Sequence, residues 1–250
     1  MAVIAISTCA YADLPLVAAL QRVAALAPAV EVRCKGRHGI ETVSQNRALA
    51  SCGLRCSVHA PEDIAIWSAD QRRRRAAIMA HERLLEACAA AGAEVYVIHP
   101  DFCESTIVQR LETRSALQAS FADLYELQRS YPVRIAVENM PGRQSSHFAA
   151  PDLDLAGLGL ALDAGHAQIS GTLEAFLRAG EIAHLHLHDN LGFATSDLHL
   201  ALGRGRLSAD LVQRLLESCD GLCVLEHASE AQVLESLGYL GRLQLGREVA

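Results

Sequence analysis

The stretch IAHLHLHD, residues 182–189, alternates apolar residues with histidines and ends in an aspartate. A strict period of two is typical of a β-strand, and it places His184, His186 and His188 on one face. Similar short apolar runs recur along the chain, separated by longer segments with helical spacing. The eight strand candidates are residues 2–6, 30–34, 55–59, 94–98, 133–138, 158–163, 182–187 and 221–226.

Eight strand–helix alternations favour a closed parallel barrel over an open sheet. The 250 residues are a typical length for one such domain, and no linker or low-complexity segment divides them. We therefore predict the α/β class and a single (β/α)₈ TIM barrel over residues 1–250. One long polar segment, residues 139–157, follows the fifth strand candidate, and loops at the carboxyl ends of barrel strands are where active sites form.

The overall charge and the cysteine pattern limit the class of protein. With a net charge of −7, the chain is not expected to grip nucleic acid through a broad basic face, although it can bind a small phosphate-bearing substrate. The Cys52/Cys56 and Cys219/Cys223 pairs are spaced C-x3-C, which favours reduced thiols in a cytoplasmic protein over a zinc knuckle. The sequence shows neither a signal-peptide pattern nor an apolar run long enough for a membrane span.

Six successive strand candidates end at or beside a histidine or an acidic residue. A lone histidine at such a position is commonly a hydrogen-bonded structural residue, but a barrel converges the side chains at its strand ends on one rim. Imidazole and carboxylate suit Zn²⁺, Mn²⁺ and Fe²⁺, and so many carboxylates would repel one another without cations. The set therefore indicates a metal site. Its members are His59, His99, Glu138, Asp163, His166, His186 and Glu226, followed along the chain by Asp197 and His199.

The three histidines of the seventh strand candidate cannot all bind one ion at the same height. His186 lies nearest the expected rim, so we predict that it is the ligand. His184 is expected to lie deeper and to be structural. His188 either supports the ligands or faces the substrate.

These residues occur in short motifs that together resemble the xylose-isomerase-like barrel superfamily. That group includes the sugar-phosphate isomerases and epimerases and the endonuclease IV family, and the resemblance runs from the second strand candidate to the eighth. The motifs are HAP (59–61), HP (99–100), EN (138–139), DAGHA (163–167), HLHD (186–189), D-x-H-x-x-x-G-x-G (197–205) and LEH (225–227).

The two branches of the superfamily imply different metal sites. The isomerase and epimerase branch implies one metal, held by Glu138, Asp163, His186 and Glu226, with the two glutamates as the acid–base pair. The endonuclease IV branch implies three zinc ions. The first would be held by His59, His99 and Glu138, the second by Glu138, Asp163, His186 and Glu226, and the third by His166, Asp197 and His199. A one-metal isomerase has no need of the D-x-H pair.

Clustered divalent ions suit phosphodiester hydrolysis, because they neutralise phosphate charge and generate a nucleophile near neutral pH. We therefore expect a metal-dependent phosphodiesterase that acts on a small nucleotide-like or corrinoid cofactor rather than on bulk DNA. This arrangement of ligand motifs also resembles the cobamide-remodelling phosphodiesterases, which cleave the nucleotide loop of corrinoid cofactors. The alternative is a single-metal sugar or sugar-phosphate isomerase or epimerase that uses Glu138 and Glu226 as its acid–base pair. A metal-stabilised sugar-binding protein is a third, non-enzymatic alternative.

Two or three divalent ions per chain are expected, with Zn²⁺ preferred and Mn²⁺ or Fe²⁺ left open. The partner is expected to be a small phosphate-containing molecule, with neither a membrane nor nucleic acid involved; the oligomeric state stays open. Aromatic side chains could stack on a flat substrate ring or serve only as loop anchors, and these are Trp67, Phe148 and Phe193. The residues predicted to bind substrate are Arg33, Lys35, Trp67, Arg143 and His188.

Overall fold

The computed structural model describes residues 2–100, 107–142 and 146–245. Its eight described strands form a closed parallel barrel in chain order, with β8 paired to β1. The predicted TIM barrel is confirmed, and each strand begins and ends within one residue of its predicted range. The strands are β1 Val3–Ser7, β2 Ala29–Arg33, β3 Arg55–His59, β4 Val95–Ile98, β5 Arg134–Glu138, β6 Gly159–Asp163, β7 Ile182–Leu187 and β8 Leu222–Leu225.

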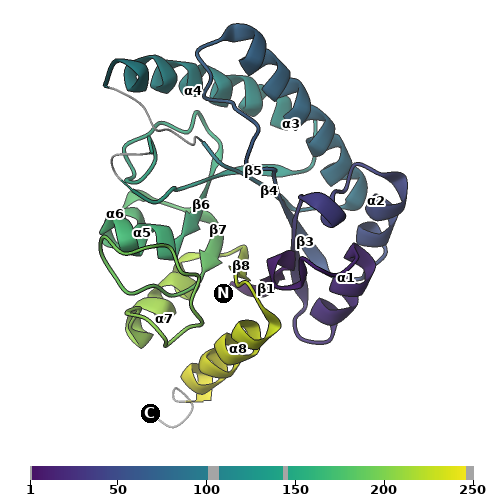
Figure 1. Cartoon of the computed structure of the whole chain (residues 1–250), viewed down its shortest axis with the longest axis vertical. Helices are drawn as coiled ribbons and strands as arrows, with labels where there is room; N and C mark the ends of the chain where they lie inside the picture. The colour runs from purple at the N-terminus through teal and green to yellow at the C-terminus, as the bar shows by residue number, and fades with distance from the viewer. Residues whose placement is uncertain (1, 101–106, 143–145, 246–250) are drawn as a thin grey trace.

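Helices surround the ring of strands (Figure 1). The connection from β5 to β6 has no helix among its described residues, whereas two short helices follow β6. The helices are η1 Thr8–Tyr11, α1 Leu16–Ala24, η2 Gly36–His38, α2 Val43–Ala50, α3 Gln71–Ala91, α4 Ile107–Gln128, α5 Ala164–Ser170, α6 Leu173–Ala179, α7 Ala209–Ser218 and α8 Glu230–Leu245.

Local sequence signals set the ends of the longest helices, as α3 illustrates. The Asp70 carboxylate caps its first turn by accepting hydrogen bonds from the backbone N–H groups of Arg72 and Arg73. Gly92 ends the helix in the left-handed conformation, with φ of 74°. The run of arginines at 72–75 therefore lies in the first turns of a capped helix.

Side chains that point into the barrel change from apolar to polar along the strands. The larger apolar core lies between the strands and the helices, and two small apolar clusters lie apart from it. Because inward side chains on a strand recur every second residue, Ala29 is followed by Glu31, and Ala136 by Glu138. Polar groups thus gather toward the carboxyl ends of the strands. The two apolar clusters are Ala5, Ala29, Leu222 and Val224, and Val95, Val97, Ala136 and Ala161.

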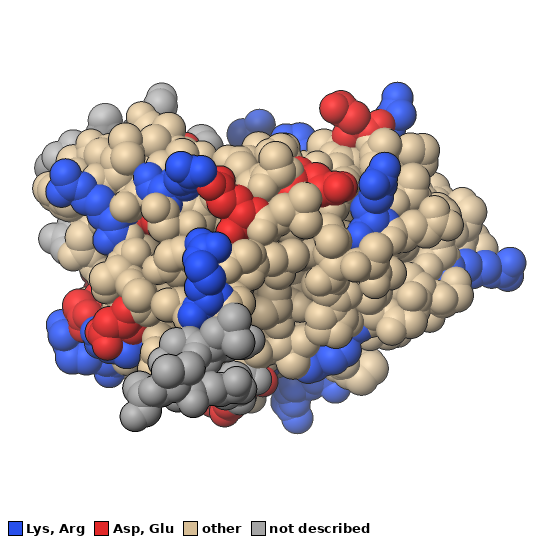
Figure 2. All heavy atoms as spheres, turned by 90° about the horizontal axis from the view of Figure 1, so that it is seen from below, with Lys and Arg blue, Asp and Glu red and all other residues tan. Residues whose placement is uncertain are grey.

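Charged side chains are interspersed on the face that Figure 2 shows, and the described thiols are free. In Figure 2, which shows one side of the molecule, basic side chains lie among acidic ones and uncharged surface and form no continuous basic field. Every cysteine in the described ranges is a free thiol, including the C-x3-C pairs. Across the same ranges, we find no helix with the length and apolar character needed to cross a membrane.

Candidate metal centre

The first group of potential ligands lies where β3, β4 and β5 end. The Nε2 atoms of His59 and His99 both lie 3.1 Å from Glu138 Oε2. His59 Nδ1 lies 2.8 Å from the carbonyl oxygen of Ala60. Since a carbonyl only accepts, His59 carries a proton on Nδ1, which leaves Nε2, facing the carboxylate, as the nitrogen that can bind a metal ion. Two imidazole nitrogens and a carboxylate oxygen therefore converge on one point.

The second group adjoins the first and shares Glu138 with it. It consists of Glu138, Asp163, His186 and Glu226, all buried, with one potential ligand atom from each lying within 4.8 Å of the others. His186 Nδ1 faces the carboxylates, at 3.2 Å from Glu226 Oε2 and 3.5 Å from Glu138 Oε1. This nitrogen is buried and makes no hydrogen bond to any described residue.

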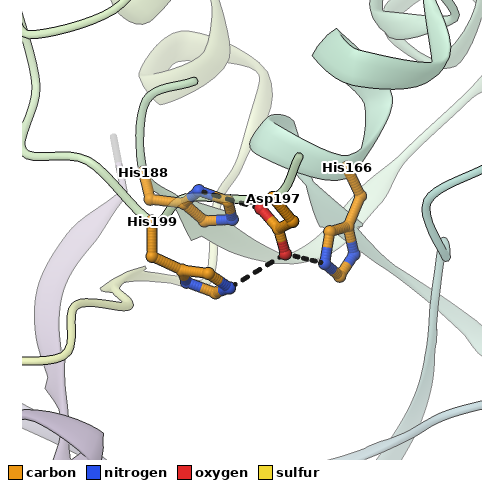
Figure 3. Close-up of side chains that lie close together, drawn as sticks. All are labelled: His166, His188, Asp197 and His199. Atoms are coloured by element: carbon orange, nitrogen blue, oxygen red, sulfur yellow. Dashed lines mark hydrogen bonds and ion pairs between the residues drawn. The ribbon is translucent and has the colours of Figure 1, made fainter. Parts of the chain in front are cut away.

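The third group is built around one carboxylate oxygen. Asp197 Oδ2 lies 3.1 Å from His166 Nε2 and 3.0 Å from His199 Nε2, and the carboxylate sits between the two rings (Figure 3). His188 lies behind this carboxylate, with its ring stacked on that of His199 at 3.9 Å between centroids. The other nitrogens of His166 and His199 donate to the carbonyl oxygens of Asn139 and Glu226, each at 2.9 Å.

Electrostatics tie the histidines of this group to their acidic neighbours. Burial alone would lower the pKa of His166, but Asp163 and Asp197 outweigh it and raise the pKa to about 10. Against the same burial effect, Asp197 and Glu226 raise the pKa of His199 to about 9. Conversely, the neighbouring histidines overcome burial and hold the pKa of the Asp197 carboxyl well below its usual range. Positive charge is therefore strongly favoured at the centre of the group.

The donor set fits divalent metal ions. His59, His166 and His199 each donate one ring N–H to a backbone carbonyl and turn the other nitrogen toward a carboxylate. This arrangement fixes the tautomer and aims a lone pair into the site, as metal-ligating histidines do in proteins. When no metal ion is bound, His166 and His199 take up a proton on this nitrogen and pair with Asp197, as their raised pKa values indicate, and a divalent ion would take the place of these protons. Imidazole and carboxylate ligands are those that zinc, manganese and iron accept.

Two motifs after β5 and β6 position these side chains. The Asn139 side chain accepts from the backbone N–H of Asp163 at 2.6 Å and donates to its carbonyl oxygen at 3.0 Å. Asp163 in turn caps α5 by accepting from the N–H of His166 at 2.6 Å. A side chain at Gly165 would overlap the ring of His188, so glycine permits the close approach of β7. The EN and DAGHA motifs are thus parts of one scaffold.

The histidines in β7 and directly after it lie at different depths in the barrel. His184 is buried beneath the rim, and its Nε2 lies 2.8 Å from Glu31 Oε2. His188 is completely buried, with Nε2 3.1 Å from the Asp163 carboxylate. One potential ligand atom of His188 lies within 4.8 Å of those of His166, Asp197 and His199, so His188 is a further candidate ligand of the third group, and a contact with substrate stays a prediction.

The predicted substrate-binding residues are dispersed. Arg33 and Lys35 line a cavity of about 680 Å³ that opens beside η1 and η2. Arg33 also forms an ion pair with Glu62 and lies 3.7 Å from Glu226 Oε1, which connects the cavity to the second ligand group. Trp67 is half-buried against the apolar core and does not line that cavity, and Arg143 lies outside the described residues.

The two phenylalanines considered for stacking lie in different surroundings, one buried and one exposed. Phe148 packs inside the core against Phe176, with ring centroids 5.6 Å apart, so stacking on a substrate is the wrong interpretation for it. Phe193 is 71% exposed, in the loop that carries Asp197.

Two acidic residues that the sequence analysis did not assign are central to the arrangement. Glu31 is fully buried beneath His186, and Asp189 is fully buried behind the third group. Glu31 interrupts an apolar strand, VEVRC, at an inward position, which is a signal that could have identified it. The sequence offers no comparable signal for Asp189, because its role depends on backbone N–H groups 14 to 18 residues further along the chain.

Comparisons with known proteins agree with this fold. The family model described as xylose isomerase-like TIM barrel matches residues 30–243. An uncharacterized protein of Mycobacterium leprae (strain TN) is 32% identical over an alignment of 205 residues that covers 68% of this chain and 68% of that protein. An uncharacterized protein of Methanocaldococcus jannaschii is 29% identical over 206 residues, covering 79% of this chain and 80% of the relative.

Similar solved structures include proteins of both kinds that the motifs suggested. A D-tagatose 3-epimerase-like protein has a TM-score of 0.86 at 23% identity, covering 99% of this chain and 100% of its own. Endonuclease IV from Thermus thermophilus has a TM-score of 0.68 at 20% identity, covering 99% and 100%. A further Thermus thermophilus protein, soaked with zinc chloride, has a TM-score of 0.72 at 24% identity, covering 96% and 97%. These likenesses establish the shared fold.

Proposed function

We propose that this chain, which belongs to the xylose isomerase-like TIM barrel family, is a metal-dependent hydrolase of a small phosphodiester. The observation that carries the proposal is the third ligand group, in which His166 and His199 share the carboxylate of Asp197. A proton shift between adjacent carbons needs one metal ion, and the second group is sufficient to hold it. A further group at the same rim is better explained by a reaction that needs several cations.

The ligands follow from the three groups. Glu138 would be a ligand in both the first and the second group, and Asp197 would be the central ligand of the third group. Zinc suits this mixture of imidazole and carboxylate, and manganese or iron would be accepted by the same ligands. When bound, such ions neutralise the phosphate oxygens and make water a nucleophile near neutral pH.

The chain's own groups would then control the proton and the leaving group. Hydrolysis forms a bond from a water oxygen to phosphorus, breaks the bond to the leaving oxygen, and moves a proton from water to that oxygen. Glu226 would carry this proton, because it belongs to the second ligand group and lies 3.7 Å from Arg33, which lines the cavity. Glu138 is buried more deeply and would hold His59 and His99 in register.

The cavity lined by Arg33, whose guanidinium lies 3.7 Å from Glu226, indicates the substrate class. Its volume of about 680 Å³ suits a small molecule, since ligand sites in proteins commonly measure about 300–1,000 Å³. Arg33, Lys35 and Arg37 on its wall favour an anionic ligand. A phosphodiester within a nucleotide-like or corrinoid cofactor meets both conditions.

A second candidate, a sugar or sugar-phosphate isomerase or epimerase, is favoured by a different observation. Glu138 and Glu226 approach the same nitrogen of His186, at 3.5 and 3.2 Å, so two carboxylates face one metal position. Such a pair could remove a proton from one carbon and return it to the next. This reaction would use the second group and leave the third without a role in the chemistry.

The decisive experiment combines elemental analysis with hydrolysis of bis(4-nitrophenyl) phosphate. The wild-type protein, purified without chelators, should hold two or three divalent ions and cleave the diester. The double variant Asp197→Asn/His199→Asn should lose one ion and at least about a hundredfold in kcat/KM. Asp210→Asn, an exposed acid in the first turn of α7, is the matched control and should change neither quantity.

Retention of full diesterase activity in the double variant would show that the three-metal interpretation is wrong. A wild-type protein that holds one ion, lacks diesterase activity and exchanges the proton next to a ketose carbonyl would establish the isomerase alternative.

A further inference from the structure

Glu31 lies inside the barrel, below the ligand groups, and its side chain is completely buried. Its carboxylate accepts a hydrogen bond from Ser57 Oγ at 3.0 Å and lies 2.8 Å from His184 Nε2. The third neighbour is His186 Nε2, 3.1 Å from Glu31 Oε1. Burying an ionised carboxylate costs several kcal/mol unless such donors compensate it, so the network needs a reason to exist.

His186 is turned the opposite way from three other histidines of the site. His59, His166 and His199 donate Nδ1–H to backbone carbonyls and turn Nε2 toward a carboxylate. His186 instead turns Nδ1 toward the second ligand group and Nε2 toward Glu31. Glu31 therefore occupies the place that a backbone carbonyl occupies for the other three rings.

We propose that Glu31 is a positioning residue that holds the proton of His186 on Nε2 and so aims the lone pair of Nδ1 at the second metal position. The inference rests on the metal centre of the proposed function, but it requires no particular substrate. A carboxylate is a stronger acceptor than a carbonyl and makes the opposite ring nitrogen more basic, which strengthens a bond to a cation.

The surroundings of Glu31 hold the carboxylate in place. Ser57 is the residue opposite Glu31 in the pairing of β2 with β3, so its hydroxyl reaches the carboxylate directly. His184 lies two residues before His186 on the same face of β7, and its Nε2 lies 2.8 Å from Oε2, the same carboxylate oxygen that accepts from Ser57. Both neighbours would fix Glu31 without touching the ligand groups.

The main competing interpretation is that Glu31, His184 and His186 hold a metal ion themselves, since one potential ligand atom from each lies within 4.8 Å of the others. That arrangement would require His186 to bind one ion through each ring nitrogen. Positioning requires a proton at Nε2 instead. The two interpretations therefore differ in the number of ions bound and in the protonation of one nitrogen.

The test measures zinc binding to the full-length protein, without substrate, by competition with a chromophoric chelator. Glu31→Gln keeps the size of the side chain but offers a single acceptor oxygen. It should hold as many zinc ions as wild type at saturation, with one of them bound about 10- to 100-fold more weakly. His81→Gln is the matched control, because His81 is equally buried but bonds to Tyr96 instead, and its zinc affinity should equal that of wild type.

A second measurement needs no Glu31 variant and holds even if Glu31→Gln fails to fold. Nitrogen-15 NMR of zinc-loaded, histidine-labelled wild-type protein should show a proton on Nε2 of His186 and zinc on Nδ1, with the signals assigned by their loss in His186→Gln. A proton on Nδ1 would overturn the inference.

Three results of the binding experiment would also overturn it. Unchanged zinc affinity in Glu31→Gln would show that the carboxylate does not act through His186. Loss of one whole equivalent of zinc in Glu31→Gln would show that Glu31 is a ligand. A wild-type protein that binds no divalent ion would remove the metal centre of the proposed function, and this result is distinct from a wild type that binds zinc but does not respond to Glu31→Gln.

Discussion

The carboxylate of Asp189 accepts a hydrogen bond from the backbone N–H of Gly205 at 2.9 Å, although sixteen residues separate them. Asp189 is fully buried, and charge-assisted hydrogen bonds of this kind are stronger than neutral ones. The hydrogen bonds that Asp189 accepts from Gly203 and Gly205 join the two ends of the loop that carries Asp197 and His199. They therefore link the HLHD motif, which Asp189 ends, to the G-x-G motif. The backbone N–H groups bonded to Asp189 are those of Asn190, Gly203, Gly205 and Leu207.

Gly205→Ala is expected to displace this loop. A β-carbon at position 205 would overlap the carbonyl oxygen of Asn190 and the carboxylate of Asp189, neither of which can move without breaking the loop. We expect the variant to lose the third metal ion and about 1–3 kcal/mol of unfolding free energy, as overpacked sites do. Elemental analysis and urea denaturation measure the two effects.

Gly241→Ala provides the control for that substitution. Position 241 lies in α8, and a β-carbon there meets no atom within 4 Å. Alanine should leave the metal content unchanged and leave stability equal or up to about 1 kcal/mol higher. If Gly205→Ala bound the same number of ions as Gly241→Ala, the loop would not depend on the contact between Gly205 and Asp189.

Removing the metal ions is expected to lower stability and abolish activity reversibly. Glu138, Asp163 and Glu226 share one buried space, and without cations their charges are balanced only by nearby histidines. Ligands that bind only the folded state add about 4 kcal/mol when present at a thousandfold excess over Kd. Calorimetry should therefore show a lower Tm after chelator treatment and recovery when zinc is added back. An unchanged Tm together with full activity in chelator would argue against a metal centre.

Glu138→Gln tests the site whichever reaction it performs. Glu138 Oε2 lies 3.1 Å from both His59 and His99, and Oε1 faces His186, so one carboxylate serves two ligand groups. Removing its charge should reduce kcat/KM by about 10²- to 10⁴-fold, because a hydrolase would lose a ligand shared by two groups and an isomerase would lose an acid–base residue, which contributes a factor of this size. The variant should also lose ions from the first two groups and keep the third at Asp197. Wild-type turnover in Glu138→Gln would contradict both enzyme proposals.

The sequence predicted the barrel more completely than the site. The strand–helix alternations and the chain length predict a barrel. The alternation of side chains along β7 also placed His184 beneath His186. What could not be predicted was any residue whose role comes from distant backbone groups or from depth inside the barrel. Asp189 is defined by N–H groups that follow it in a loop, and Glu31 is defined by rings that only barrel closure brings together.

The aromatic and basic candidates illustrate the same limit. Phe148, which lies within the polar segment 139–157, was considered for substrate stacking, yet it is buried and packs on Phe176. Arg33 was predicted to bind substrate and lines the cavity, but its ion pair with Glu62 depends on the loop after β3. Side chains on loops therefore need the folded structure before their partners can be named.

The pH dependence of stability is expected to depend measurably on His81, far from the ligand groups. Burial lowers the pKa of His81 from 6.5 to about 4, so the ring is neutral in the fold but takes up a proton in the unfolded chain below pH 6.5. Between pH 6.5 and 4 the unfolded state therefore binds more protons, and stability falls as the pH is lowered, by about 3 kcal/mol in all from this group. His81→Gln removes that contribution and should flatten the acid limb. Urea denaturation of chelator-treated protein across this range measures the difference, and parallel curves for wild type and variant would show that His81 does not titrate with folding.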